Sequence, residues 1–134
     1  MPDIVVSLDR ITKRFAGHTA VHALSLSVPA GAVFGLLGPN GAGKSTTIRM
    51  IMHILEPDEG TVTLFGGPGT GRELSARIGF LPEERGLYPR MEVLEQLIFL
   101  GEAKGLRRKD ARTRALHWLD RLGLPDWGKR KVQE

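Results

Sequence analysis

The stretch GPNGAGKST, residues 38–46, places three glycines, one lysine and two hydroxyl side chains in nine positions directly after an apolar run. It matches the pattern G-x-x-x-x-G-K-[ST], whose fixed positions are Gly38, Gly43, Lys44 and Ser45. A glycine-rich turn alone would be weak evidence, but here a strand pattern precedes the loop and a helical pattern follows it. Strand, glycine loop and helix in this order form a cradle in which backbone N–H groups and the helix N-terminus bind phosphate.

The residues on either side of this loop carry the patterns that a phosphate cradle requires. Residues 31–38, GAVFGLLG, predict a short buried strand, because the strands of parallel sheets are apolar on both faces. Residues 44–55 predict a helix. Its apolar face consists of Ile48, Ile51, Met52 and Leu55. Lys44 would then reach the β- and γ-phosphates of a nucleotide, and Ser45 would offer its hydroxyl to Mg²⁺.

Strand patterns dominate the rest of the N-terminal part, and helical patterns follow them. The predicted strands cover residues 4–15, 20–31, 61–67 and 77–82, with a glycine-rich loop at 66–71. Helices are predicted at residues 91–105 and 108–123, because each has a helical apolar period and ends at glycine. The apolar side of the second helix consists of Ala111, Ala115, Trp118, Leu119 and Leu122.

The length and amino-acid composition exclude several classes of protein. A chain of 134 residues is long enough for one domain with its own core. It has no cysteine, which excludes disulfides and thiolate zinc sites, and no apolar run long enough to span a membrane. We expect a soluble protein without a secretion signal. The net charge of +4 comes from residues 68–134, and the basic excess concentrates in residues 104–131. The ten basic and three acidic side chains there favour a solvated helix face and leave a nucleic-acid surface as an alternative.

Several further stretches, in the right order, resemble the ATP-binding cassette of ABC transporters along the whole chain. KRFAG contains Phe15, at the position of the aromatic residue that stacks on adenine in that family. GPNGAGKST is the family's own form of the phosphate loop, the Walker A motif, and PDEGTVTLFG resembles the strand after the first helix. IGFLPEERGLYPRMEVLEQL resembles the glutamine loop and the start of the helical subdomain that faces the transport subunits. LPEERGLYP is similar to the subgroup that serves ABC-2-type exporters.

This resemblance implies an α/β fold of the P-loop NTPase class, ABC-cassette type. Residues 1–90 would form the nucleotide-binding core, with an antiparallel β-subdomain and the Walker A strand, loop and helix. Residues 91–134 would begin the helical subdomain. The implied function is that of an ATP-binding subunit that uses Mg²⁺-ATP to energise solute export, with ATPase activity in the full-length protein. The implied partners are a transmembrane permease subunit and a second nucleotide-binding domain, at the cytoplasmic face of the cell membrane.

The resemblance also assigns roles to individual residues. Lys44 and Glu83 are the implied catalytic residues, and Ser45 and Glu83 are the implied magnesium ligands. Glu83 stands where the family usually has glutamine, and a carboxylate also suits Mg²⁺. The implied nucleotide contacts are Phe15, Val21, Gly38, Pro39, Asn40, Gly41, Ala42, Gly43, Lys44, Ser45 and Thr46.

Other motifs of the cassette are not found in these 134 residues. The signature sequence, the Walker B glutamate and the switch histidine would follow Glu134, as would the strands that separate residues 31–38 from 77–82 in the family's parallel sheet. We therefore expect the chain to correspond to the N-terminal half of a cassette, which binds nucleotide without turning it over. An ABC-type ATPase that acts on nucleic acid or the ribosome is the alternative. A GTPase is disfavoured because the chain has no N-K-x-D sequence.

Overall fold

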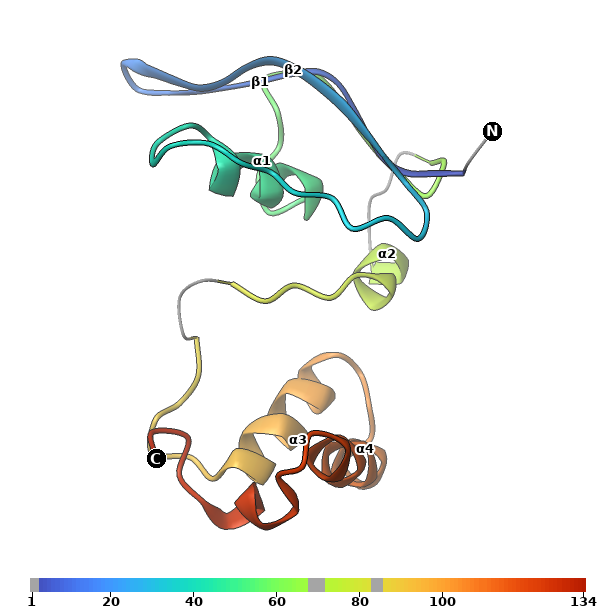
Figure 1. The fold of residues 1–134 in the computed structure, drawn as a ribbon, viewed down its shortest axis with the longest axis vertical. Coiled ribbons are helices and arrows are strands. Elements are labelled where there is room, and N and C mark those ends of the chain that lie inside the picture. The colour runs from blue at the N-terminus through green and yellow to red at the C-terminus, as the bar shows by residue number, and fades with distance from the viewer. Residues whose placement is uncertain (1–2, 68–71, 83–85) are drawn as a thin grey trace. The chain divides into compact units, whose positions relative to one another are not determined.

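The computed structural model describes residues 3–67, 72–82 and 86–134 (Figure 1). Glu83, for which the sequence predicts a role in catalysis and magnesium binding, lies outside these residues. The chain forms two compact units, Met1–Phe80 and Leu81–Glu134. In the described residues, every helix is too short or too polar to cross a membrane.

The first unit contains a three-stranded antiparallel sheet. Its strands are β1 (Ile4–Phe15), β2 (His18–Pro29) and β3 (Glu59–Leu64), in the order β2-β1-β3. β1 has the predicted bounds, β2 begins two residues earlier than predicted, and a turn at Gly17 with a φ of 75° joins them. In β2, the alternation of half-buried leucine and valine with exposed serine confirms the prediction of one polar face.

A bulge in β1 sets which side chains enter the core. The pairing with β2 shifts register between Leu8 and Ile11, where Arg10 adopts a φ of 47° and its N–H donates to Ser25 Oγ over 2.9 Å. The extra residue rotates the strand, so that Leu8 and Ile11 are both buried. The core of this unit consists of Leu8, Ile11, Val21, Met50, Val62 and Leu64.

The helix after the glycine loop, α1 (Lys44–Ile51), is shorter than predicted. Of its predicted apolar face, Ile51 and Leu55 pack against the core, whereas Ile48 is partly exposed. Thr47 and Met50 are the buried residues of the helix. The helix ends before His53, whose φ of 52° cannot continue a right-handed helix.

Two predicted strands are not formed in this structure. Residues 31–38 have irregular backbone, with the side chains of Val33 and Leu37 almost fully exposed. Residues 78–82 are also irregular, with Leu81 exposed, and the short helix α2 (Arg72–Arg77) ends before them. A strand needs a neighbour for its N–H and C=O groups, and the three described strands pair with one another instead.

The second unit is a helical hairpin closed by a short 3₁₀ helix. α3 (Val93–Ala103) packs on α4 (Arg108–Arg121), and η1 (Pro125–Lys129) packs on both. A Cβ atom at Gly101 would lie 2.8 Å from the Cβ of Ala111, so glycine allows the two helices to approach closely. The buried side chains are Gln96, Ile98, Ala111, Ala115 and Leu119.

The apolar side of α4 is narrower than the sequence predicted. Ala111, Ala115 and Leu119 are buried, but Trp118 is 52% exposed and Leu122 is 65% exposed. The buried residues are spaced four apart and form a single stripe on the helix. Trp118 and Leu122 lie beside this stripe, so only part of the predicted apolar side is buried.

Candidate functional site

The predicted phosphate loop folds around the side chain of its own lysine. Lys44 Nζ donates hydrogen bonds of 2.7 Å to the backbone oxygens of both Gly38 and Pro39. The N–H of Ala42 donates to Pro39 O over 3.2 Å. Gly41 adopts a φ of 81°, in the left-handed region that favours glycine. The lysine therefore lies within the turn, where its charge is next to the backbone that would surround a phosphate.

The loop leads directly into the N-terminus of α1. Gly43 is the N-cap residue, with a φ of 86°, and its carbonyl oxygen accepts the first helical bond from Thr47 N–H over 2.8 Å. The N–H groups of Lys44, Ser45 and Thr46 precede this bond, so the helix itself offers them no acceptor. The first turn of α1 contains no acidic residue that would offset the positive end of its dipole. This arrangement favours a bound anion.

The loop is held in place by strand β2. A Cβ atom at Gly43 would lie 2.3 Å from the carbonyl oxygen of Ala20 and 2.9 Å from Val21 Cγ2. Only glycine permits this approach, because a side chain would collide with backbone as well as with Val21. The structure therefore places Val21, a predicted nucleotide contact, in the core beside the loop.

Phe15, the predicted adenine contact, is the last residue of β1 and pairs with His18 across the hairpin turn. Its ring is 46% exposed, and Lys13 Nζ lies 6.0 Å from the ring centroid. In Figure 1 the hairpin turn and the loop before α1 lie at the same end of the first unit, in agreement with the contact between Gly43 and β2. The structure thus brings an exposed aromatic ring and the phosphate loop to the same end of one unit.

The other predicted nucleotide contacts differ in their exposure to solvent. Asn40 and Ser45 are exposed, and Thr46 is half-buried in the first turn of α1. Among the described residues, no group of three or more histidine, aspartate or glutamate side chains could hold a metal ion.

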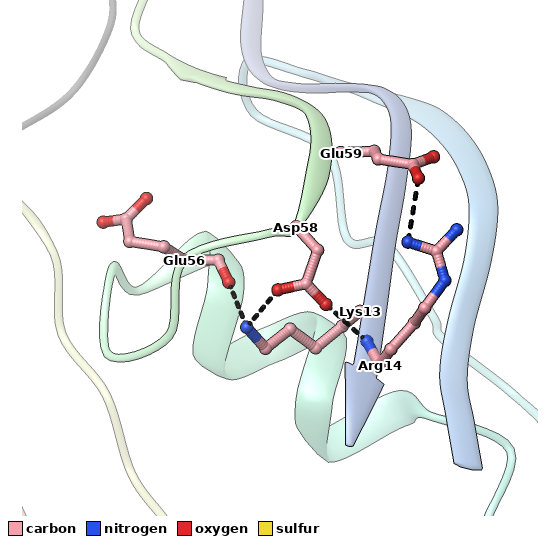
Figure 2. Close-up of polar contacts among 5 residues, drawn as sticks. All are labelled: Lys13, Arg14, Glu56, Asp58 and Glu59. Carbon is pink, nitrogen blue, oxygen red and sulfur yellow. Dashed lines mark hydrogen bonds and ion pairs between the residues drawn. The ribbon is translucent and has the colours of Figure 1, made fainter. Parts of the chain in front are cut away.

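Sequence reasoning missed a polar network beside this site (Figure 2). The Asp58 carboxylate accepts 2.8 Å from Lys13 Nζ and 2.6 Å from the N–H of Arg14. These hydrogen bonds, the one from Lys13 above all, lower the pKa of the Asp58 carboxyl below its usual value. In the sequence, Asp58 belongs to the stretch EPDEG, residues 56–60, which predicts the end of a helix. This local pattern gives no indication of the contacts that Asp58 makes with β1.

The chain is similar in sequence to ATP-binding proteins of ABC transporters. A family model described as ABC transporter matches residues 21–134. The chain is 43% identical over 130 residues to the uncharacterized ABC transporter ATP-binding protein YhaQ of Bacillus subtilis, covering 97% of this chain and 43% of that protein. It is 39% identical over 127 residues to the daunorubicin/doxorubicin resistance ATP-binding protein DrrA of Streptomyces peucetius, covering 93% of this chain and 38% of that protein.

A solved structure shares the fold. The crystal structure of a nucleotide-free ATP-binding cassette from an ABC transporter aligns with a TM-score of 0.78 at 27% identity, covering 98% of this chain and 58% of that one. This likeness confirms the predicted fold class. The chain spans less than half the length of the two relatives named above.

Proposed function

The chain belongs to the ABC transporter family of ATP-binding proteins, and we propose that it binds Mg²⁺-ATP through residues 38–46 and Phe15. The observation that carries this proposal is the loop geometry. Gly43 caps α1 in a left-handed conformation, and the positive helix end lacks an acidic side chain in its first turn. Backbone N–H groups, a helix dipole and the Lys44 ammonium together provide what a triphosphate requires.

Each predicted residue would contact a different part of the nucleotide. Lys44 would leave the carbonyl oxygens that it now contacts and bind the β- and γ-phosphates, as the lysine of a phosphate loop does. Ser45 would hold Mg²⁺, which neutralises charge on the phosphates when bound. Phe15 would stack on adenine, because its ring is exposed beside the hairpin turn. Gly38, Pro39, Asn40, Gly41, Ala42 and Thr46 complete the proposed contacts.

For the whole protein we propose ATP hydrolysis coupled to solute export through a transmembrane permease subunit, with a second nucleotide-binding domain as partner. Lys44 and Glu83 keep their predicted catalytic roles. Residues 1–90 would bind nucleotide, and residues 91–134 would face the permease. In support, Phe99 of α3 is about half exposed, and Tyr88, just before these residues, stacks edge to face on it with ring centroids 5.8 Å apart. Exposed aromatic side chains are enriched at protein interfaces.

Calorimetric titration of the chain with Mg²⁺-ATP tests the nucleotide-binding proposal. We expect saturable binding that Lys44→Ala weakens strongly, because the phosphate charge then lacks its cation. Lys109→Ala is the matched control, since it removes the same charge from an exposed position of α4 in the other unit. Equal ATP affinity in the parent and the Lys44→Ala variant would show that the loop is not the binding site.

A further inference from the structure

Asp58 joins the strand that carries Phe15 to the segment that follows α1 (Figure 2). Its backbone N–H donates to Thr12 O over 2.8 Å, and its carboxylate accepts from the backbone N–H of Arg14 over 2.6 Å. Asp58 is therefore hydrogen-bonded to the backbone of two β1 residues, Thr12 and Arg14, although it lies outside that strand. Arg14 is the residue directly before Phe15, next to the hairpin turn where strands otherwise fray.

Lys13 strengthens the same connection with its side chain. Its Nζ donates 2.8 Å to the Asp58 carboxylate and 2.8 Å to the backbone oxygen of Glu56. The Lys13 side chain is only 16% exposed, so these bonds are less screened by solvent than those of a surface ion pair. The pair of Arg14 and Glu59 nearby is more exposed, with side chains 48% and 60% accessible.

The other end of α1 is attached to the same hairpin. Gly43, at the start of the helix, contacts Ala20 and Val21 of β2, as the close approach described above requires. β1 and β2 are hydrogen-bonded along their length, so both attachments act on one hairpin. The β1–β2 hairpin, the phosphate loop, α1 and the turn around Asp58 are thus connected in a ring. Both the phosphate loop and Phe15 belong to this ring.

We propose that Asp58 is a positioning residue for nucleotide binding, which fixes the end of β1 that carries Phe15 relative to the phosphate loop. This inference rests on the proposed function, because it needs ATP to contact Phe15 and the loop together. Asp58 itself would touch neither adenine nor phosphate. It acts through the backbone of Arg14 and the side chain of Lys13, and it should affect recognition of the base without affecting recognition of phosphate.

The test compares two ligands, Mg²⁺-ATP and magnesium tripolyphosphate, which carries the phosphates without the base. Stacking of one base on an aromatic ring changes affinity by about 5- to 150-fold. A misplaced ring loses part of that, so Asp58→Asn should weaken ATP binding by about three- to tenfold and leave tripolyphosphate binding unchanged. Lys13→Met should act in the same direction. Glu59→Gln is the matched control, since it removes the neighbouring carboxylate without touching the Arg14 N–H, and it should change neither affinity.

A double-mutant cycle with Phe15→Ala separates positioning from general loss of structure. If Asp58 acts through the ring, Asp58→Asn should have no further effect on ATP affinity once Phe15 is alanine. Equal weakening of ATP and tripolyphosphate, or additive effects of the two substitutions, would overturn the positioning role. Failure of the proposed function would give a different result. In that case Lys44→Ala, as a single substitution, would change the affinity for neither ATP nor tripolyphosphate.

Discussion

Replacement of Gly43 by alanine tests how the phosphate loop is held against the sheet. An alanine with a φ of 86° is in the left-handed region, which costs about 1–2 kcal/mol. Its Cβ would also lie 2.3 Å from the backbone oxygen of Ala20, and relief of such overpacking costs about 1–3 kcal/mol more. We therefore expect Gly43→Ala to lower the free energy of unfolding of the first unit by about 2–5 kcal/mol.

Gly41→Ala is the matched control for this prediction. Gly41 has a similar φ of 81°, but a Cβ there would meet nothing within 4 Å. Its cost should be the conformational part alone, about 1–2 kcal/mol. The assay is hydrogen exchange of β1 amides in urea, because Trp118 and Trp127 both lie in the second unit and their fluorescence would report on that unit. Equal losses in the two variants, within about 0.5 kcal/mol, would refute the contact between the loop and β2.

Three further predictions concern stability and association. Leu119→Ala should lower the free energy of unfolding of the second unit by about 2–5 kcal/mol, measured by tryptophan fluorescence, whereas Leu116→Ala on the exposed side should cost far less. The lowered pKa of Asp58 means that its carboxylate stabilises the fold above the ordinary value of 3.8 and that this contribution fades as the pH falls below it. Thermal unfolding should therefore show the parent more stable than Asp58→Asn at neutral pH, with the difference vanishing in acid, and a constant difference would contradict this. The exposed side chains of Val33, Leu37 and Leu81 predict association that rises with protein concentration in light scattering and weakens in Leu37→Lys, and an unchanged monomer at all concentrations would contradict it.

The sequence predicted best the features whose signals are local. The glycines of residues 38–46 indicated a phosphate loop, and Gly41 and Gly43 both adopt the positive φ that favours glycine. The long apolar alternations predicted β1 and β2 nearly to their bounds, because period-two patterning marks a half-buried strand. The phosphate loop was recognisable for the same reason, since its residue types follow from the backbone conformation they must adopt.

Features that depend on distant neighbours were not predictable in this way. Residues 31–38 are as apolar as a buried strand, but composition does not reveal which strand will pair with them, and here none of the described strands does. The apolar period of α4 located its inner side, but the width of that side depends on how much α3 covers, which leaves Trp118 exposed. Asp58 could be recognised only as a turn residue, because its partners Lys13 and Arg14 lie more than forty residues away in sequence. The role of Glu83 stays a prediction.

The most direct test of the central claim is an amide correlation spectrum of the ¹⁵N-labelled chain, recorded during titration with Mg²⁺-ATP. We expect the largest shifts at Gly41, Gly43, Lys44 and Ser45, with a further shift at Phe15, and we expect the amides of α4 not to shift. Loss of these shifts in the Lys44→Ala variant would accompany that result. Shifts confined to the basic face of α4, or no shifts at saturating ATP, would contradict nucleotide binding at the loop.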